Sequence, residues 1–330
     1  MTAFKKIFSF ILRIGISTAL LIFLFKFNKI DIRVLGDVIK GADKPILLLA
    51  FFVFFFSYLL CLLRWNILLK AAGIKIPFKR VVVSYSGGIF FNLLLPSAIG
   101  GDVTRSIDLA THTKKGAEVV ATVFLDRLCG YMALAIFVLL ATGLGWQLVS
   151  DNSLVIISVL VITSVLAAIL LIIFNRFIYS KIGALLRFVR ASKIRESIRN
   201  LHNEVHIFRD RKGVLINSLL LSLLVQLISP IVFFLIALSL GIRVNIIYFF
   251  IFVPIIGAVS MLPISLGGLG VREGATVFFF MEAGITQGLA VGISLINFAF
   301  ILLYAAIGGF IYVLTVHHRR VQRNPPSLVQ

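Results

Sequence analysis

The chain has 330 residues, of which 60% are hydrophobic and 14% are charged, and its mean hydropathy is +1.09. Soluble helices keep a polar face, so this composition excludes a soluble helical protein and indicates an integral membrane protein. The net charge of +19 comes from basic residues that gather beside apolar segments. Such clusters are typical of loops next to anionic lipid, so we expect the bilayer and no nucleic acid as the partner of these charges.

The first predicted element is a membrane helix over residues 7–27. It follows Lys5 and Lys6 and is too long for the apolar core of a signal peptide, and no A-x-A cleavage motif comes after it. Five further apolar segments are near or above the roughly 20 residues that a helix needs to cross the hydrocarbon. They are residues 46–63, 117–141, 154–174, 214–240 and 286–314. We therefore predict an all-α, polytopic helical bundle with about six full crossings.

Loop charges orient these crossings. Residues 64–80 carry five basic residues and no acid, residues 176–212 carry ten basic and three acidic ones, and residues 142–153 carry no Lys or Arg. The positive-inside rule puts the two basic segments and the basic C-terminal tail in the cytoplasm and residues 142–153 outside. One loop, residues 26–44, runs against the rule, with five basic and three acidic residues on the predicted outer side.

This orientation holds only if two apolar segments enter the membrane and return on the same side. The segments are residues 81–101, which start from the cytoplasm, and residues 246–281, which start from outside. We therefore predict two re-entrant hairpins of opposite topology, an arrangement typical of the inverted repeats of secondary transporters.

A ten-residue motif occurs once in each predicted hairpin, at residues 96–105 and 263–272. Both copies read Pro, three residues, Gly-Gly, three residues, Arg. Glycines let the backbone turn and approach a ligand, a helix starting after them points N–H groups into the site, and arginine favours an anion. The alternative is that these glycines serve only tight turns and helix contacts. The candidate substrate-binding residues are Arg105, Arg272, Asp102, Asn92, Gly100, Gly101, Gly267, Gly268 and Gly270.

Charged residues inside the apolar segments form a second group of candidates. Asp126 lies about 14 Å into its predicted helix, near mid-depth, where a charge is costly and faces the bundle interior. We expect Asp126 to pair with Arg105 or Arg272, and Arg127 to pair with Asp102 or Glu273. The alternative is a purely structural network of ion pairs. The predicted buried network consists of Glu118, Asp126, Arg127, Glu273 and Arg64.

Other chemistry-bearing patterns do not emerge. His202 and His206 are spaced i, i+4, but the glutamate between them is in the wrong place for a zinc protease motif, and both lie in the basic 176–212 segment, which reads as amphipathic. Cys61 and Cys129 lie inside apolar segments and indicate no disulfide framework. We expect no metal, no cofactor and no catalytic residue.

The motifs resemble those of a known family. The chain resembles the lysylphosphatidylglycerol synthase transmembrane-region family in these motifs: Arg64-Trp65, residues 85–92, Leu95-Pro96, residues 100–102 with Arg105, Glu118 with residues 125–127 and Gly130, and residues 263–274. The resemblance extends over residues 10–318 and implies a flippase-like protein that moves lipids or lipid-linked sugars between leaflets. In longer relatives a soluble aminoacyl-transferase domain follows this region. This chain ends at Gln330, so we do not expect transferase activity.

We thus expect one flippase-like membrane domain over residues 1–318, followed by a short basic cytoplasmic tail over residues 319–330. Its substrate would be an anionic phospholipid or a polyprenyl-phosphate-linked glycan, carried through a polar cavity at the interface of the hairpins. The alternative function is that of an enzyme, or a membrane subunit of one, that transfers aminoacyl or glycosyl groups to lipid headgroups. We expect a multi-pass protein of the cell inner membrane with both termini in the cytoplasm.

Overall fold

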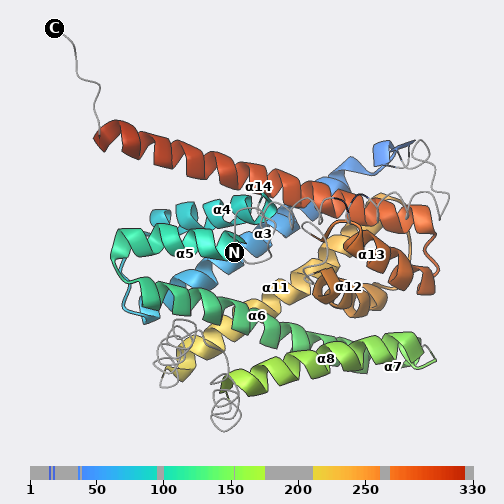
Figure 1. Cartoon of the computed structure of the whole chain (residues 1–330). Helices are drawn as coiled ribbons and strands as arrows, with labels where there is room; N and C mark the ends of the chain where they lie inside the picture. Colours follow the sequence, from blue (N-terminus) through green and yellow to red (C-terminus); the bar gives the residue numbers. More distant parts are fainter. Residues whose placement is uncertain are drawn as a thin grey trace.

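The computed structural model describes residues 39–94, 100–151, 153–174, 211–260 and 268–323, with a few single positions before residue 38. Within these ranges all regular elements are helices (Figure 1). They are α3 (Lys44–Ala71), α4 (Phe78–Leu94), α5 (Gly100–Thr113), α6 (Gly116–Leu144), α7 (Trp146–Val149), α8 (Ser153–Phe174), α11 (Lys212–Ser239), α12 (Ile246–Ser260), α13 (Val271–Glu282) and α14 (Gln287–Arg323). The predicted first crossing and the basic segment 176–210 lie outside the described residues.

Four of the described helices are long and apolar enough to cross a membrane: α3, α6, α11 and the portion of α14 from Gln287 to Thr315. Each coincides with a predicted crossing, and α8 covers a fifth, so the prediction of an all-α, multi-pass membrane protein is confirmed. Helix α14 continues to Arg323 rather than ending near residue 314, so the predicted tail begins as helix.

Eight of the described helices, α3 to α6 and α11 to α14, form two units with the same order of elements, and α7 and α8 follow the first unit. Helices α3 and α11, which open the units, are each 28 residues long. Two residues after each helix ends comes a glycine with positive φ, Gly73 at +72° and Gly241 at +77°. Such a residue terminates a helix without steric cost because glycine has no Cβ. The next helix starts five residues later in both units, and a pair of short helices and a long helix complete each one.

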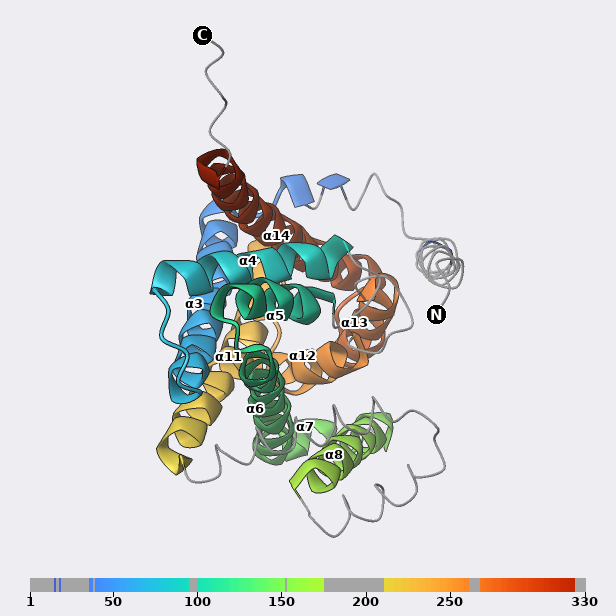
Figure 2. The same cartoon turned by 60° about the vertical axis from the view of Figure 1, so that its left-hand side comes forward.

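The units interlock through their hairpins. Helix α3 packs along α11, while α4 lies against α14 and α12 against α6, so each hairpin contacts the last helix of the other unit (Figures 1 and 2). The predicted first hairpin ends at Gly101, whereas helix α5 begins at Gly100 and continues to Thr113. This helix packs against both α4 and α6.

Glycines set how closely the first hairpin packs. A Cβ added at Gly101 would lie 2.0 Å from the carbonyl oxygen of Gly88, so α4 and α5 touch backbone to backbone. On the other face of α4, a Cβ added at Gly308 of α14 would lie 2.8 Å from the carbonyl oxygen of Ser86. Helix α4 is therefore held between α5 and α14 at distances that only glycine permits. Small residues at such contacts are how membrane helices pack tightly.

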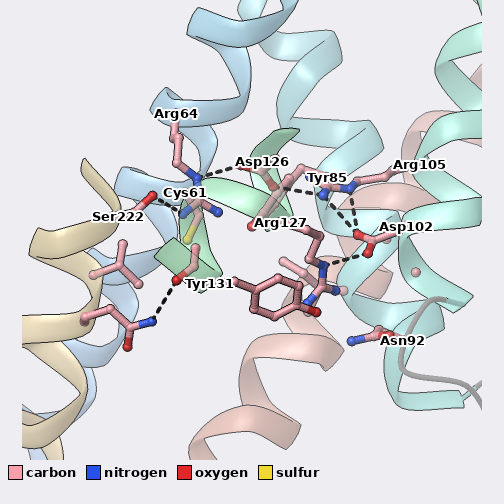
Figure 3. A pocket seen from close by; sticks show the side chains of 16 residues that line it. Cys61, Arg64, Tyr85, Asn92, Asp102, Arg105, Asp126, Arg127, Tyr131 and Ser222 are labelled. Atoms are coloured by element: carbon pink, nitrogen blue, oxygen red, sulfur yellow. Dashed lines mark hydrogen bonds and ion pairs between the residues drawn. The ribbon is translucent and has the colours of Figure 1, made fainter. Parts of the chain in front are cut away.

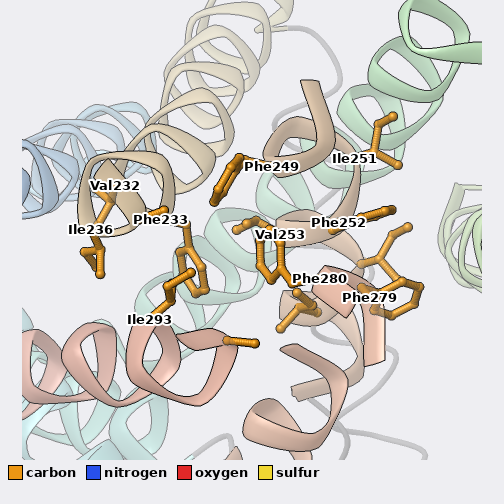
Figure 4. Close-up of a cluster of buried hydrophobic side chains, with 14 of the residues drawn as sticks. Val232, Phe233, Ile236, Phe249, Ile251, Phe252, Val253, Phe279, Phe280 and Ile293 are labelled. Carbon is orange, nitrogen blue, oxygen red and sulfur yellow. The ribbon is translucent and has the colours of Figure 1, made fainter. Parts of the chain in front are cut away.

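The second hairpin lies in the apolar core instead. Phe249 and Phe252 of α12 pack on Phe280 of α13, with the ring centroids of Phe249 and Phe280 4.8 Å apart (Figure 4). Ile236 of α11 and Ile293 of α14 close this cluster and are fully buried. The two hairpins thus have different surroundings: the second packs into the aromatic and aliphatic core and holds a local ion pair, Arg272 with Glu273, whereas several charged side chains gather at the first.

Candidate functional site

A cavity of about 310 Å³ opens between α3, α4, α5, α6 and α11. Its wall is unusually polar for the interior of a membrane protein (Figure 3). The polar and charged side chains that line it are Arg64, Tyr85, Asn92, Asp102, Arg105, Asp126, Arg127, Tyr131, Ser222 and Gln226.

Asp126 of α6 is the centre of the charges. Its Oδ1 accepts a hydrogen bond from Arg64 Nε at 2.6 Å, and its Oδ2 accepts one from Arg105 Nη2 at 2.9 Å. The Asp126 side chain is 3% exposed, so this carboxylate lies between two guanidinium groups with almost no water around it. It therefore joins α3, α5 and α6 at one point.

Asp102, at the start of α5, extends the charges toward the cavity. Its Oδ1 lies 3.0 Å from Arg105 Nη2 and accepts from Arg105 Nε at 3.1 Å, while its Oδ2 accepts from Arg127 Nε at 2.7 Å. The result is a continuous chain of alternating sign, which we call the charged chain: Arg64, Asp126, Arg105, Asp102 and Arg127.

The charged chain is not neutral. Its three guanidinium groups face two carboxylates, which leaves one positive charge over. Nη1 of Arg105 is buried and has no hydrogen-bond partner among the described residues. The Arg127 side chain is 36% exposed, which makes it the most accessible of the five side chains of the charged chain. Buried donors are nearly always satisfied, so a buried guanidinium with a vacant donor beside a cavity fits an anionic ligand.

Neighbouring helices hold these side chains in place. The guanidinium of Arg105 lies over the rings of Trp65 and Tyr85, with centroids 4.7 and 5.0 Å from its carbon Cζ. Such cation–π contacts stabilise a charge that has little water around it. Arg64 also donates from Nη1 to Ser222 Oγ at 2.8 Å, which ties α11 to the network.

The structure brings most of the sequence-predicted residues together and separates others. Arg105, Asp102, Asn92 and Gly101 line the cavity with Arg64, Asp126 and Arg127, and Gly100 begins α5 and is buried beside them. Glu118, in the first turn of α6, lies outside the charged chain. Gly267 falls outside the described residues, and Gly268 and Gly270 take positive φ values of 78° and 84° before α13.

Arg272 and Glu273 form a separate cluster. Arg272 Nη2 lies 2.8 Å from Glu273 Oε1, its Nε donates to Ser294 Oγ at 3.3 Å, and its Cζ lies 4.8 Å from the Phe298 ring centroid. Glu273 Oε2 also accepts from the backbone N–H of Gly270 at 2.6 Å. Arg272 thus has its own carboxylate next to it in sequence and does not line the cavity. Asp126 is paired with Arg105 and not with Arg272, and Arg127 with Asp102 and not with Glu273.

Sequence reasoning did not single out several side chains of the cavity wall. Tyr85 and Tyr131 are aromatic residues in apolar helices, and Ser222 is a single hydroxyl in a long apolar segment. None carries a charge that would stand out in hydrocarbon. A signal existed for Tyr85 and Tyr131: each lies within four residues of a glycine that also lines the cavity, Gly88 or Gly130.

Comparison with known proteins bears on the same residues. The model of the family described as the lysylphosphatidylglycerol synthase TM region matches residues 10–309. The chain belongs to this family. All the residues that line the cavity lie in the matched range together with both hairpins, and the family supports a membrane role related to lipids. The match does not by itself assign a transport or transfer reaction.

Relatives of similar length share the assignment to the membrane. The chain is 26% identical over 279 residues to a UPF0104 membrane protein of Pyrococcus horikoshii, and this alignment covers 78% of this chain and 82% of that protein. It is 25% identical over 285 residues to a UPF0104 membrane protein of Methanothermobacter thermautotrophicus, covering 79% and 82% of the two chains. No solved structure matches.

Proposed function

We propose that this protein moves an anionic lipid between leaflets and that the lipid headgroup binds in the charged cavity. The observation that carries the proposal is the surplus positive charge of the charged chain, with a vacant buried donor on Arg105 and a partly exposed guanidinium on Arg127. Anionic phospholipids and polyprenyl-phosphate-linked glycans both offer a phosphate that would meet these donors.

The charged chain supplies a way to receive and release that phosphate. A phosphate that approaches Arg127 competes with Asp102 for the same guanidinium, while Asp102 keeps its contact with Arg105. Arg64 and Asp126 remain paired and hold the helices together. Binding therefore exchanges one ion pair for another instead of leaving a charge bare, which keeps the cost of both entry and exit low.

The lengths of the hairpin arms favour re-entrant segments. Helices α4 and α5 have 17 and 14 residues, and α12 and α13 have 15 and 12. Each is shorter than the roughly 20 residues needed to cross the hydrocarbon. With the loop charges, this supports two hairpins that enter from opposite faces as inverted repeats in the inner membrane, with both termini in the cytoplasm. Exposure would then alternate by movement of one unit against the other.

Reconstituted protein tests the proposal. Liposomes carrying an anionic phospholipid labelled on its acyl chain are treated with a membrane-impermeant quencher, and the loss of protected signal gives the translocation rate. Arg127→Gln removes the surplus charge, and Arg127→Lys keeps it. Losing a charge-assisted contact costs about 1.5–3 kcal/mol, so Arg127→Gln is expected to slow translocation roughly tenfold to a hundredfold.

The matched control is Arg243→Gln, which removes an exposed arginine between α11 and α12 that does not line the cavity. It should leave the rate unchanged, and Arg127→Lys should stay closer to wild type than Arg127→Gln. A wild-type rate in Arg127→Gln, or no translocation above protein-free liposomes for the wild type, would overturn the proposal.

A further inference from the structure

A second hollow, of about 350 Å³, lies between α6 and α11. Its wall is apolar except for Lys212 at one end. The apolar residues are Leu125, Leu128, Cys129 and Met132 of α6, and Leu215, Ile216 and Leu219 of α11. None of these residues lines the charged cavity, so the two hollows are distinct. We call this second hollow the α6–α11 groove.

One end of the groove is strongly basic. Lys212 is the first residue of α11 and is exposed, and Arg211 directly before it donates to the carbonyl oxygen of Ala71 at the end of α3. Lys115, at the start of α6, donates to the carbonyl oxygen of Gly73 at 3.2 Å. The C-terminus of α3 and the N-termini of α6 and α11 therefore meet with three basic side chains among them.

We propose that the α6–α11 groove binds an anionic phospholipid, with one acyl chain along its apolar wall and the phosphate at Lys212 and Arg211. The volume falls within the range of about 300–1,000 Å³ that is typical of small-ligand sites. The occupant available to an apolar groove in a membrane protein is hydrocarbon, and basic residues at the groove's end select an anionic headgroup from the bilayer. The proposal concerns a resident lipid and does not require that the protein transport lipids.

The groove continues toward the charged cavity along one face of α11. Lys212, Leu215 and Leu219 line the groove, and Ser222 and Gln226 follow at spacings of three and four residues and line the cavity. A lipid in the α6–α11 groove would thus lie next to the hydrogen bond between Ser222 and Arg64. Its binding stabilises the packing on which one wall of the cavity depends.

Binding is measured on delipidated, detergent-solubilised protein. Phosphatidylglycerol and phosphatidylcholine with identical acyl chains are added in turn, and the thermal unfolding temperature and the lipids retained in native mass spectrometry are recorded. The wild type is expected to bind phosphatidylglycerol at least tenfold more tightly than phosphatidylcholine and to be stabilised more by it.

Two substitutions locate the site. Leu219→Trp fills the groove and should abolish most of the stabilisation by phosphatidylglycerol, whereas Leu220→Trp, on the exposed neighbour that does not line the groove, should not. Lys212→Gln should remove the preference for the anionic lipid, whereas Lys75→Gln, on an exposed lysine outside the groove, should keep it. If Leu219→Trp does not fold, Leu219→Phe gives the same comparison with a smaller added volume.

Two results would overturn the proposal. One is equal stabilisation of the wild type by both lipids. The other is unchanged retention of phosphatidylglycerol in Leu219→Trp or Leu219→Phe, which would place the lipid elsewhere. The readout is binding and not transport, and the comparisons are repeated in the Arg127→Gln background, so that lipid held by the charged cavity is separated from lipid in the groove.

Discussion

Asp126→Asn removes the central negative charge of the charged chain with little change in side-chain shape. Asparagine keeps the volume of the side chain but removes the charge that Arg64 and Arg105 share at 2.6 and 2.9 Å. The charged chain would then hold three guanidinium groups and one carboxylate, so its surplus rises from one positive charge to two. Both arginines are buried, with side chains 9% and 4% exposed.

Removing one partner of a buried ion pair costs about 3–5 kcal/mol, because the other charge is left uncompensated. Arg105 retains Asp102, whereas Arg64 retains only the Ser222 hydroxyl among its described partners. Most of the cost should therefore come from Arg64. Neutralising Arg64 as well should recover part of this cost. We therefore expect the double variant Asp126→Asn with Arg64→Gln to lose at least about 1 kcal/mol less stability than the sum of the losses of the two single variants.

Unfolding by titration with a denaturing detergent in mixed micelles, followed by circular dichroism, measures these free energies for the four proteins of the cycle. Asp151→Asn, at an exposed loop position, is the control for a carboxylate-to-amide change and should be near neutral. If the two single effects add to the double effect within about 0.5 kcal/mol, Asp126 and Arg64 are not coupled and the reasoning is wrong.

Three further predictions test other parts of the account. Gly101→Ala should separate α4 from α5 and lower the free energy of unfolding by about 1–3 kcal/mol, whereas Gly116→Ala, whose added Cβ meets only ordinary contacts, should not; equal stability of the two variants would contradict the close packing. Arg272→Gln leaves Glu273 buried beside a neutral side chain, so it should reduce stability while translocation per folded molecule stays at the wild-type value; a selective loss of translocation would show that Arg272 acts on the substrate. In a variant without native cysteines, a cysteine at position 193 should react with a membrane-impermeant thiol reagent only from the cytoplasmic side; labelling from outside would contradict the predicted topology.

Hydropathy predicts the long helices well because a crossing requires an uninterrupted apolar segment. Helix α3 shows where that reasoning stops. The uncharged window ends at residue 63, yet the helix continues through Arg64 to Ala71, because Asp126 neutralises the arginine inside the bundle. Helix α5 was not predicted at its full length, since Asp102, Arg105 and Asp108 make it too polar to resemble a membrane segment.

The candidate site was likewise only partly predictable from the sequence. The first Gly-Gly motif and the charges inside apolar helices predicted residues of the cavity, whereas no described residue of the second motif lines it. The sequence did not predict which charged side chains pair, because the pairs join distant positions. Arg64 and Asp126 are 62 residues apart in the sequence, and Arg64 and Ser222 are 158 apart. The repeated motif also suggested that Arg105 and Arg272 act together. The difference lies in their neighbours, because Glu273 and Ser294 satisfy Arg272 locally, whereas Arg105 keeps a vacant donor.

In the proposed function, the surplus positive charge of the cavity recognises an anionic headgroup during translocation. The most direct measurement compares, in the same proteoliposomes, the translocation rates of labelled phosphatidylglycerol and labelled phosphatidylcholine with identical acyl chains. The account predicts that the wild type moves the anionic lipid at least tenfold faster and that Arg127→Gln brings the ratio of the two rates close to one. Equal rates for both lipids in the wild type, or an unchanged ratio in Arg127→Gln, would contradict it.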